Sequence, residues 1–389
     1  MNILIDALTA REGGGVTYVR ELVPSLVRAA PEHVFHVLLS PCYQAALVHD
    51  LRDVAKPVLV ELDSGRMMAR LWYQQVGLPR LIRNRGFDLL YTVNEVGAIG
   101  PPCPHVVLAR NLNVFEAPVG TRSGRSDPNF VYRLTRGPIA RRTIQGAARV
   151  VFVSSAFRER VMLHLPLDRA RTVIIHHGVS EAFRPATGER PDGGAGPDDL
   201  AGRDYVLTVS TVAPHKGIDV LIAAFAAARD RAGEGFPDLA VAGALTDRAM
   251  HAKLIRQTRA LGLEGRVHFL DRVAYERLPA LYRRAVTFVF PSNSETFGQP
   301  LIEAMASGAP VIASALPACA EVCRDAALYF QPGRIDELSE RLSSVLGDAM
   351  LRERLRARAL ARAADFSWSE TAQRLVAVLE DAAISRETA

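Results

Sequence analysis

Two glutamates eight residues apart are the residues of this chain whose types and spacing most directly suggest chemistry. Glu295 and Glu303 stand in the segment 288–312, where an apolar run ending at Phe290 predicts a buried strand. The proline, asparagine and glycine that follow the run predict a turn that delivers Glu295 to the carboxyl end of that strand. Ligands of parallel sheets gather at such ends. The spacing therefore suits a site for a nucleotide sugar.

A short helix is predicted directly after this turn. Pro300 suits the first helical position, Glu303 follows in the first turn, and Gly308 closes the helix. Unpaired N–H groups and the positive end of the helix dipole coincide at a helix N-terminus, so we expect a diphosphate above residues 297–300. One glutamate is then placed to bind sugar hydroxyls and the other to bind ribose hydroxyls, neither as a nucleophile.

The alternative for such a pair is that Glu295 is an exposed turn residue and Glu303 a helix acid stabilised by the dipole. The segments around the two glutamates favour the ligand site, because they resemble the E-x7-E signature of family 4 retaining glycosyltransferases. The donor-binding residues that this resemblance implies here are Glu295, Thr296, Phe297, Gly298, Gln299, Pro300 and Glu303.

The length and composition of the chain indicate how many domains it has and which class of protein it belongs to. Its 389 residues, 49% of them hydrophobic, predict two domains. No apolar run approaches the roughly 18 residues of a membrane span, and the N-terminus reads as a first strand, so we expect a cytoplasmic protein. The four cysteines lack zinc or redox spacing and are expected to be reduced thiols.

The charge balance bears on the partners. The net charge is +5 and the isoelectric point about 9.2. No zinc finger, aromatic-interleaved basic stripe or RNA-binding signature is present, so no nucleic acid partner is expected. The inner face of a negatively charged membrane stays among the candidate partners, as a peripheral contact.

Short runs rich in Val, Ile and Leu recur between amphipathic segments and predict strands that alternate with helices. In the first half the expected strands are residues 2–6, 34–39, 57–61, 88–92, 105–109, 149–153 and 172–175. In the second half they are residues 205–209, 238–242, 266–270, 286–290, 310–313 and 327–330, with helical patterns such as 217–229 and 250–261. Such alternation predicts an α/β protein with two doubly wound, Rossmann-like parallel sheets.

The domain boundaries follow from composition and from the resemblance. Residues 185–203 are rich in Pro, Gly and Asp and predict a linker between residues 1–184 and residues 204–365. The resemblance implies the two-domain GT-B fold, whose domains face each other across a cleft. It assigns the acceptor side to the first domain and the nucleotide sugar to the second. Residues 366–389 are expected to form a helix that crosses back to the first domain.

Lys216 is the expected partner of the diphosphate. It lies in the segment 208–217, which resembles the loop after the first strand of the family's donor domain, and it matches the diphosphate-binding lysine. An ammonium there would neutralise charge on the leaving group, although a solvated lysine at a helix start is the alternative. Many members carry an arginine five residues earlier, where this chain has Thr211. His215 and Arg272 are candidate replacements.

A second donor-domain segment, residues 268–273, resembles the strand and loop whose backbone contacts the nucleotide base. Arg272 and Val273 are therefore expected in the donor site, and Asp271 stands where glycine is common. Tyr282 matches a family tyrosine on the next helix, but its helical spacing favours a packing role.

In the first half, Gly14 and Gly15 follow the first strand and open an amphipathic helix. Glycines let a backbone approach a ligand closely, and by resemblance this loop meets the donor phosphate and the acceptor. Arg110 and Asn111 replace the His-Asp pair of many relatives and are expected on the acceptor side, although Asn111 alternatively caps a turn. The loop 115–127 carries arginines that could bind an anionic acceptor. The alternative is that they form a solvated charged face.

The resemblance implies retaining transfer of a hexose or N-acetylhexosamine from a UDP- or GDP-sugar to an acceptor hydroxyl, in polysaccharide or lipid-linked glycan assembly. The acceptor is a carbohydrate, a lipid-linked glycan or a small molecule. Lys216 and Glu295 are the expected catalytic residues, and the absence of a D-x-D motif predicts no metal and no cofactor besides the donor. Alternatives are transfer to a secondary metabolite, a nucleotide-sugar epimerase, or an inactive binding protein, which Thr211 motivates.

Overall fold

The computed structural model divides into two compact units, each with its own sheet. Of the described residues, those up to 178 and from 367 onward belong to unit 1, and those from 179 to 366 belong to unit 2. The structure describes residues 1–11, 13–62, 67–115, 130–185, 200, 202–232 and 235–384. Most of the expected linker and all but the first residue of the loop 115–127 lie outside the described residues.

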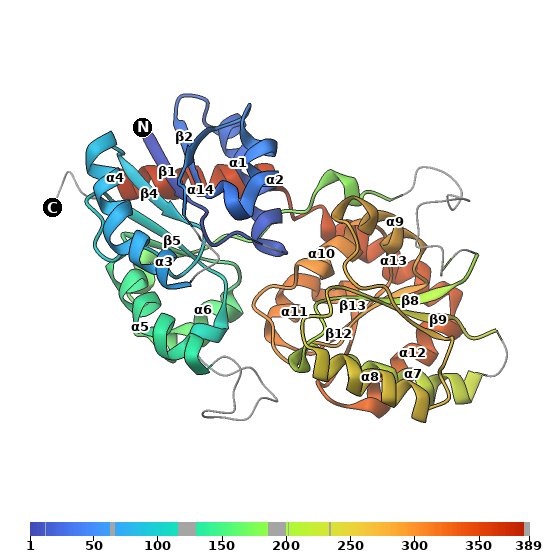
Figure 1. The fold of residues 1–389 in the computed structure, drawn as a ribbon. Helices are drawn as coiled ribbons and strands as arrows, with labels where there is room; N and C mark the ends of the chain where they lie inside the picture. The colour runs from blue at the N-terminus through green and yellow to red at the C-terminus, as the bar shows by residue number, and fades with distance from the viewer. Residues whose placement is uncertain are drawn as a thin grey trace. The chain divides into compact units, whose positions relative to one another are not determined.

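Unit 1 is built on a seven-stranded parallel sheet in the order β3-β2-β1-β4-β5-β6-β7 (Figure 1). Its strands are β1 (Asn2–Asp6), β2 (Val34–Leu39), β3 (Lys56–Leu59), β4 (Leu89–Thr92), β5 (His105–Ala109), β6 (Arg149–Phe152) and β7 (Thr172–Ile174). Its helices are α1 (Gly14–Ala29), α2 (Pro41–Leu51), α3 (Met67–Trp72), the π-helix η1 (Tyr73–Gly77), α4 (Leu78–Arg85), α5 (Phe130–Gly146), α6 (Ser155–Met162) and α14 (Trp368–Ile384).

Unit 2 has a six-stranded parallel sheet in the order β10-β9-β8-β11-β12-β13. Its strands are β8 (Tyr205–Val209), β9 (Asp238–Ala242), β10 (Val267–Phe269), β11 (Thr287–Phe290), β12 (Val311–Ser314) and β13 (Ala327–Phe330). Its helices are α7 (Ile218–Ala232), α8 (Arg248–Ala260), α9 (Leu278–Arg284), α10 (Gln299–Ala306), α11 (Pro317–Cys323), α12 (Ile335–Gly347) and α13 (Ala349–Ala363).

The predicted fold class is confirmed, and each expected strand forms within one or two residues of its predicted bounds. Most of the strands are buried on both faces by helices, which is why they read as continuous apolar runs. The edge strands β3, β7, β10 and β13 are partly exposed. In each sheet the strand order reverses once, between β1 and β4 in unit 1 and between β8 and β11 in unit 2. Ligands of open α/β sheets bind at such topological switch points, beyond the carboxyl ends of the strands.

The last helix belongs to unit 1. Helix α14 packs against α1 (Figure 1), and Thr371 Oγ1 donates to the carbonyl oxygen of His176 at 2.9 Å. The chain leaves unit 1 after Gly178, and a Cβ built there would lie only 2.2 Å from the backbone nitrogen of Trp368. Glycine at position 178 therefore lets the segment that leaves unit 1 contact the backbone of the segment that returns to it at Trp368.

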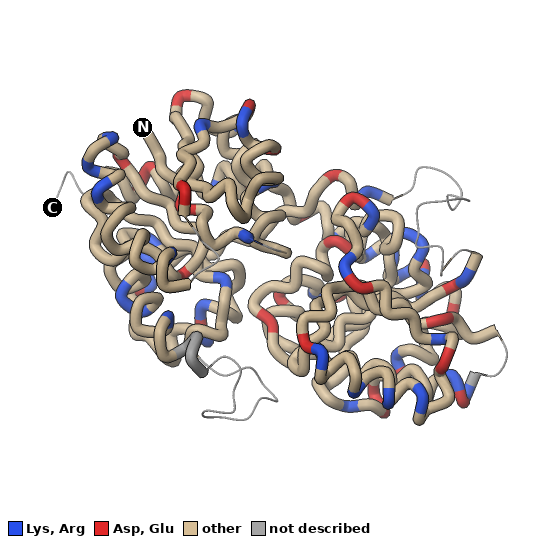
Figure 2. Tube along the Cα trace, in the orientation of Figure 1, with Lys and Arg blue, Asp and Glu red and all other residues tan. Residues whose placement is uncertain are grey.

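Charged residues of both signs are interspersed over the helices of both units (Figure 2). This is the usual distribution on solvated helical faces. No disulfide joins any of the four cysteines. Among the described residues, none of the helices combines the length and the apolar character needed to cross a membrane.

Candidate functional site

The switch point of unit 2 brings together a lysine and a glutamate that are far apart in the sequence. Lys216 follows β8 and Glu295 follows β11, and Lys216 Nζ lies 3.0 Å from Glu295 Oε2. Their side chains are 17% and 15% exposed, so the ion pair is largely but not wholly removed from solvent. Lys216 Nζ also lies 5.9 Å from the centroid of the Phe290 ring. An ammonium has three N–H donors, so it can keep Glu295 and still reach a phosphate oxygen.

The electrostatics of this pair are set by burial and by the partner. Burial alone would raise the pKa of Glu295, but the charge of Lys216 and the N–H of Thr296 outweigh burial, and the pKa lies below its ordinary value. Burial and the neighbouring Lys216 lower the pKa of His215 to about 4. The imidazole is therefore neutral at pH 7 and does not replace the positive charge of the arginine that Thr211 displaces.

Two glycines explain why the chain folds in this way around the pair. Lys216 ends a single 3-10 turn, and Gly217 follows in the left-handed region with φ 65°. A Cβ on Gly217 would lie 2.1 Å from the carbonyl oxygen of Pro291, so only glycine lets the two loops meet. Gly298, with φ 93°, likewise turns the chain into α10.

The start of α10 corrects two details of the prediction. The helix begins at Gln299, so Pro300 occupies the second position and Glu303 lies beyond the first turn. The N–H of Thr296 already donates to Glu295 Oε1 and that of Leu301 to the carbonyl oxygen of Gly298, while proline has no N–H. Fewer amides than expected are left for an anion, which increases the importance of Lys216.

Glu303 is buried and tied to a neighbouring helix. Its side chain is 5% exposed, and its Oε2 accepts a hydrogen bond from the hydroxyl of Tyr282 on α9 at 3.1 Å. Burial and the nearby carboxylate raise the pKa of Tyr282 well above its ordinary value, so the phenol stays a donor. Helical spacing favoured a packing role for Tyr282; the structure shows that it also orients the second carboxylate.

The other residues predicted for the donor site differ in their surroundings. Thr211 and Arg272 are exposed and Val273 is partly buried, all on loops after β8 and β10. Asp271 has φ 51°, which is the left-handed region and explains why glycine is common there. The ring of Phe297 is buried against that of Phe366, 6.1 Å between centroids, so its side chain is part of the core. Gln299 and Pro300 are partly buried.

The switch point of unit 1 brings the predicted first-half residues together. Gly14 and Gly15 form the first turn of α1, and Arg110 directly follows β5. A Cβ on Gly14 would lie 3.5 Å from Arg110 Nη2, so the guanidinium reaches the glycine turn. Asn111 Oδ1 accepts the N–H of Asn113 at 3.0 Å and caps a 3-10 turn, which is the alternative considered for this residue.

Sequence reasoning did not single out Glu95, which lies in the same place. Its side chain is fully buried after β4, and its Oε2 accepts the backbone N–H of Arg110 at 3.5 Å. Nearby, the hydroxyls of Tyr18 and Tyr91 are 2.6 Å apart, and the Arg110 guanidinium carbon lies 5.8 Å from the centroid of the Tyr18 ring. In the sequence, the signal that could have identified Glu95 is its position as an acidic residue just after an apolar run.

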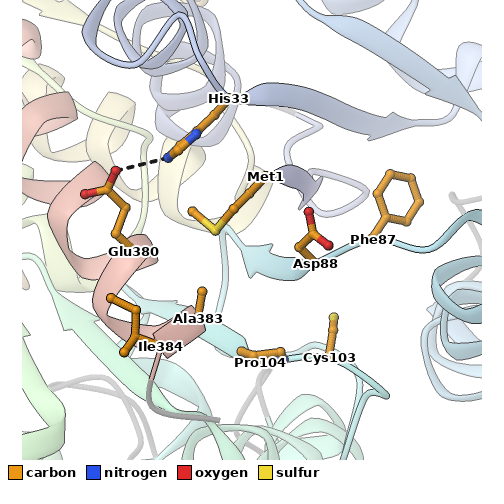
Figure 3. Close-up of a pocket in the computed structure, with 9 residues that line it drawn as sticks. All are labelled: Met1, His33, Phe87, Asp88, Cys103, Pro104, Glu380, Ala383 and Ile384. Atoms are coloured by element: carbon orange, nitrogen blue, oxygen red, sulfur yellow. Dashed lines mark hydrogen bonds and ion pairs between the residues drawn. The ribbon is translucent and has the colours of Figure 1, made fainter. Parts of the chain in front are cut away.

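A hollow of about 950 Å³ lies elsewhere on unit 1 (Figure 3). Met1, Asp88 and Pro104 line it, and each immediately precedes a strand, so the hollow lies at the amino ends of β1, β4 and β5. Across it, His33 Nε2 and Glu380 Oε1 are 3.1 Å apart. Because ligands of parallel sheets gather at the opposite ends, we do not assign the donor to this hollow.

Two family models match the chain, and each covers most of one unit. A model described as "Glycosyl transferases group 1" matches residues 199–362, and a model described as "Glycosyltransferase Family 4" matches residues 12–183. The first of these ranges contains Lys216 and both glutamates of the unit 2 site.

Individual relatives agree with these models. The chain is 37% identical to O-antigen chain mannosyltransferase B of Escherichia coli over 171 residues, 43% of this chain and 44% of that protein. It is 34% identical to D-inositol 3-phosphate glycosyltransferase of Salinispora tropica over 234 residues, 57% of this chain and 48% of that protein. The chain spans about half the length of the curated relatives it matches. Among solved structures, Anabaena HepE in complex with UDP-glucose aligns with a TM-score of 0.73 at 18% identity, over 98% of this chain and 100% of that one.

Proposed function

The chain belongs to glycosyltransferase family 4 and has the GT-B fold, and we propose that it transfers a hexose from a nucleoside-diphosphate sugar to an acceptor hydroxyl with retention of the anomeric configuration. The observation that carries this proposal is the Lys216–Glu295 ion pair at the switch point of unit 2, directly before α10. Unit 2 is the proposed donor domain and unit 1 the proposed acceptor side.

In the proposed reaction, Lys216 holds the leaving diphosphate. The acceptor oxygen attacks the anomeric carbon on the face from which the phosphate departs, the bond from that carbon to the phosphate oxygen breaks, and the acceptor proton passes to the departing phosphate. Lys216 and the positive end of the α10 dipole stabilise the charge that develops on this group. Glu295 positions the ammonium and binds donor sugar hydroxyls.

Glu303 is the proposed ribose ligand. A carboxylate suits this task because it accepts hydrogen bonds from two adjacent hydroxyls. The bond from Tyr282 holds one oxygen of Glu303 in place, so the geometry is set before the donor arrives. No metal ion takes part in this scheme.

The donor and the pathway are inferred from relatives. One similar protein is named an O-antigen chain mannosyltransferase and another a D-inositol 3-phosphate glycosyltransferase, so a hexose donor and polysaccharide assembly are the first choice. GDP-mannose is therefore the first donor to test, and UDP-glucose the second, because a structural neighbour was solved with it. We place the reaction in the cytoplasm, with a membrane-borne acceptor reached from its inner face.

The test has two steps. Thermal unfolding is measured with GDP-mannose, UDP-glucose, UDP-N-acetylglucosamine and ADP-glucose, since a ligand present at 100 times its Kd adds roughly 2.7 kcal/mol to the stability of the native state. Transfer to a panel of methyl glycosides is then followed with the stabilising donor, and the product anomer is read by NMR. An inverted anomer would contradict the proposed mechanism.

The rival functions give different results in the same assays. An epimerase would convert the donor when no acceptor is present. A binding protein without activity, which the exposed Thr211 and the neutral His215 motivate, would be stabilised by a donor but would transfer nothing to any glycoside. The proposed enzyme should transfer sugar to a glycoside and should leave the donor unconverted when no acceptor is present. This pair of results separates the proposed activity from both rivals.

A further inference from the structure

The loop after β4 contains a buried carboxylate for which the donor site has no use. Glu95 lies three residues beyond the end of β4, at the carboxyl edge of the unit 1 sheet, and is fully buried. Its Oε2 accepts the N–H of Arg110, whereas its Oε1 is buried with no hydrogen-bond partner within the described part of the chain. Leaving a buried polar atom unsatisfied costs roughly 1–3 kcal/mol, and more for a charged one. Stability alone does not explain such a residue.

A π-helix fixes this loop. Gln74 lies in η1, and its Nε2 donates to the carbonyl oxygen of Val96 at 3.2 Å and to Asp6 Oδ2 at 2.8 Å. The residue after Glu95 is thereby tied to the end of β1. π-helical turns are rare and frequently occur at functional sites. The position of Glu95 is thus set by the scaffold and not by a ligand.

Arg110 approaches the same place from β5. A Cβ on Gly14 would lie 3.5 Å from Arg110 Nη2, and one on Gly15 would lie 3.8 Å from it. The guanidinium therefore lies within van der Waals range of the turn that follows β1. Three neighbouring strands, β1, β4 and β5, thus contribute a glycine turn, a carboxylate and a guanidinium to one edge of the sheet.

We propose that Glu95 binds a hydroxyl group of the acceptor sugar through Oε1, with Arg110 beside it. The carboxylate offsets much of the positive charge of the nearby guanidinium, so the pair suits a neutral, polyhydroxylated ligand better than a phosphate. This inference rests on the proposed glycosyl transfer, because it names the residue that holds the acceptor. The proton of the attacking hydroxyl still passes to the leaving phosphate, and Glu95 takes no part in bond cleavage.

The test is Glu95→Gln, which keeps an oxygen for the N–H of Arg110 and nearly the same volume. With the donor that stabilises the wild type and methyl α-mannoside as the acceptor probe, we expect the acceptor KM to rise roughly 10-fold, as for loss of a hydrogen bond to a charged group. The donor KM and the slow transfer of the donor sugar to water should change less than about twofold. Glu380→Gln, at the opposite edge of the same sheet, is the matched control and should change neither KM.

A pH profile separates binding from a structural role. Burial raises the pKa of Glu95 to about 7, and Arg110 is the charged group that acts on it. Tyr18 and Tyr91 are the titratable neighbours of Arg110. Burial also raises the pKa values of both tyrosines, so they stay neutral. The wild-type acceptor KM should therefore fall as pH rises from about 6 to 8, because the carboxylate is the better acceptor of a hydrogen bond. Glu95→Gln should abolish this dependence.

Each other outcome overturns the inference. A higher donor KM would mean that Glu95 faces the donor sugar, and an unchanged acceptor KM would mean that it only supports the loop. If Glu95→Gln does not fold, Arg110→Gln is measured instead; it keeps the backbone N–H that Glu95 accepts and should raise the acceptor KM alone. A wild-type protein that binds no nucleotide sugar would refute the proposed function itself, a result recognisable before any variant is made.

Discussion

The two switch points use the same location in the fold for acids with opposite electrostatics. In unit 2, Glu295 is 3.0 Å from Lys216 and keeps some solvent exposure, and its pKa lies below the ordinary value. In unit 1, Glu95 is fully buried, and burial raises its pKa to about 7 although Arg110 lies nearby. Topology therefore fixes where a site forms, whereas pairing and burial decide which charge it presents.

This difference matches two kinds of ligand. A partly exposed ammonium next to a carboxylate can exchange solvent for a charged diphosphate without leaving any group unpaired. A dry carboxylate beside a guanidinium suits neutral hydroxyls, which cost less to desolvate. The contrast predicts that variants at the two points fail differently, in turnover or donor affinity for unit 2 and in acceptor affinity or pH response for unit 1.

The largest effect is expected for Lys216→Ala. If Lys216 stabilises charge on the leaving phosphate as proposed, its removal should lower kcat roughly 10² to 10³-fold, by analogy with the loss of one oxyanion donor. Donor binding should weaken less, because the charge is greatest in the transition state. Steady-state kinetics with the donor that stabilises the wild type measure both quantities.

Lys253→Ala is the control for this variant. Lys253 also pairs with a carboxylate of unit 2, that of Asp219 at 2.8 Å, but on exposed helices. Its loss should leave kcat within twofold. Wild-type turnover in Lys216→Ala would contradict the catalytic role proposed for the unit 2 site.

The second prediction uses the opposite pKa shifts of the two acids. The folded-state pKa of Glu95 exceeds the ordinary value of 4.5, so its protonated form adds stability below pH 4.5, and this contribution is lost as pH rises through about 7. Relative to the wild type, Glu95→Gln should therefore gain about 3 kcal/mol in free energy of unfolding between pH 4.5 and pH 8. Urea unfolding at a series of pH values measures this difference.

Glu295→Gln should show the reverse trend. Because the folded-state pKa of Glu295 is lowered, its carboxylate adds stability above pH 4.5, and this contribution is lost as pH falls through the folded pKa. The variant should thus be less stable than the wild type at pH 7 and approach it in acid. If the free energy of unfolding changed with pH in the same direction for both variants, burial and pairing would not give the two glutamates opposite pKa shifts.

The contrast also marks what the sequence could predict. Apolar runs bounded by turns are local signals, so the parallel fold and every strand in the described part of the chain could be predicted. Lys216 and Glu295 could be matched to a family motif, but their 3.0 Å contact joins loops after two different strands and has no local signal. Glu95 was missed because nothing in its neighbours shows that its carboxylate is buried. Burial of a polar group becomes visible only when helices cover the sheet.

The third prediction concerns the glycines of the two sites. Gly217→Ala would force a Cβ to within 2.1 Å of the carbonyl oxygen of Pro291 at a φ of 65°, and should cost at least about 2 kcal/mol of stability. Gly14→Ala would place a Cβ at an ordinary 3.5 Å from Arg110 Nη2, in the first turn of a helix, and should change stability by less than about 0.5 kcal/mol. Thermal unfolding of both variants gives the comparison. Equal losses would mean that the unit 1 turn is as tightly packed as the unit 2 loop.

The smallest effect is expected for Tyr282→Phe. The variant keeps the ring in its packing against Phe288, 5.3 Å between centroids, and removes only the hydroxyl that donates to Glu303 at 3.1 Å. Losing one buried hydrogen bond of about 1 kcal/mol should raise the donor Kd roughly fivefold and leave the acceptor KM unchanged. Glu303→Gln should raise the same Kd further, since it weakens the proposed ribose contact itself. If calorimetric titration gave Tyr282→Phe the wild-type donor affinity while Glu303→Gln lost it, the phenol would be a packing residue, and the orientation of Glu303 would have to come from α10 alone.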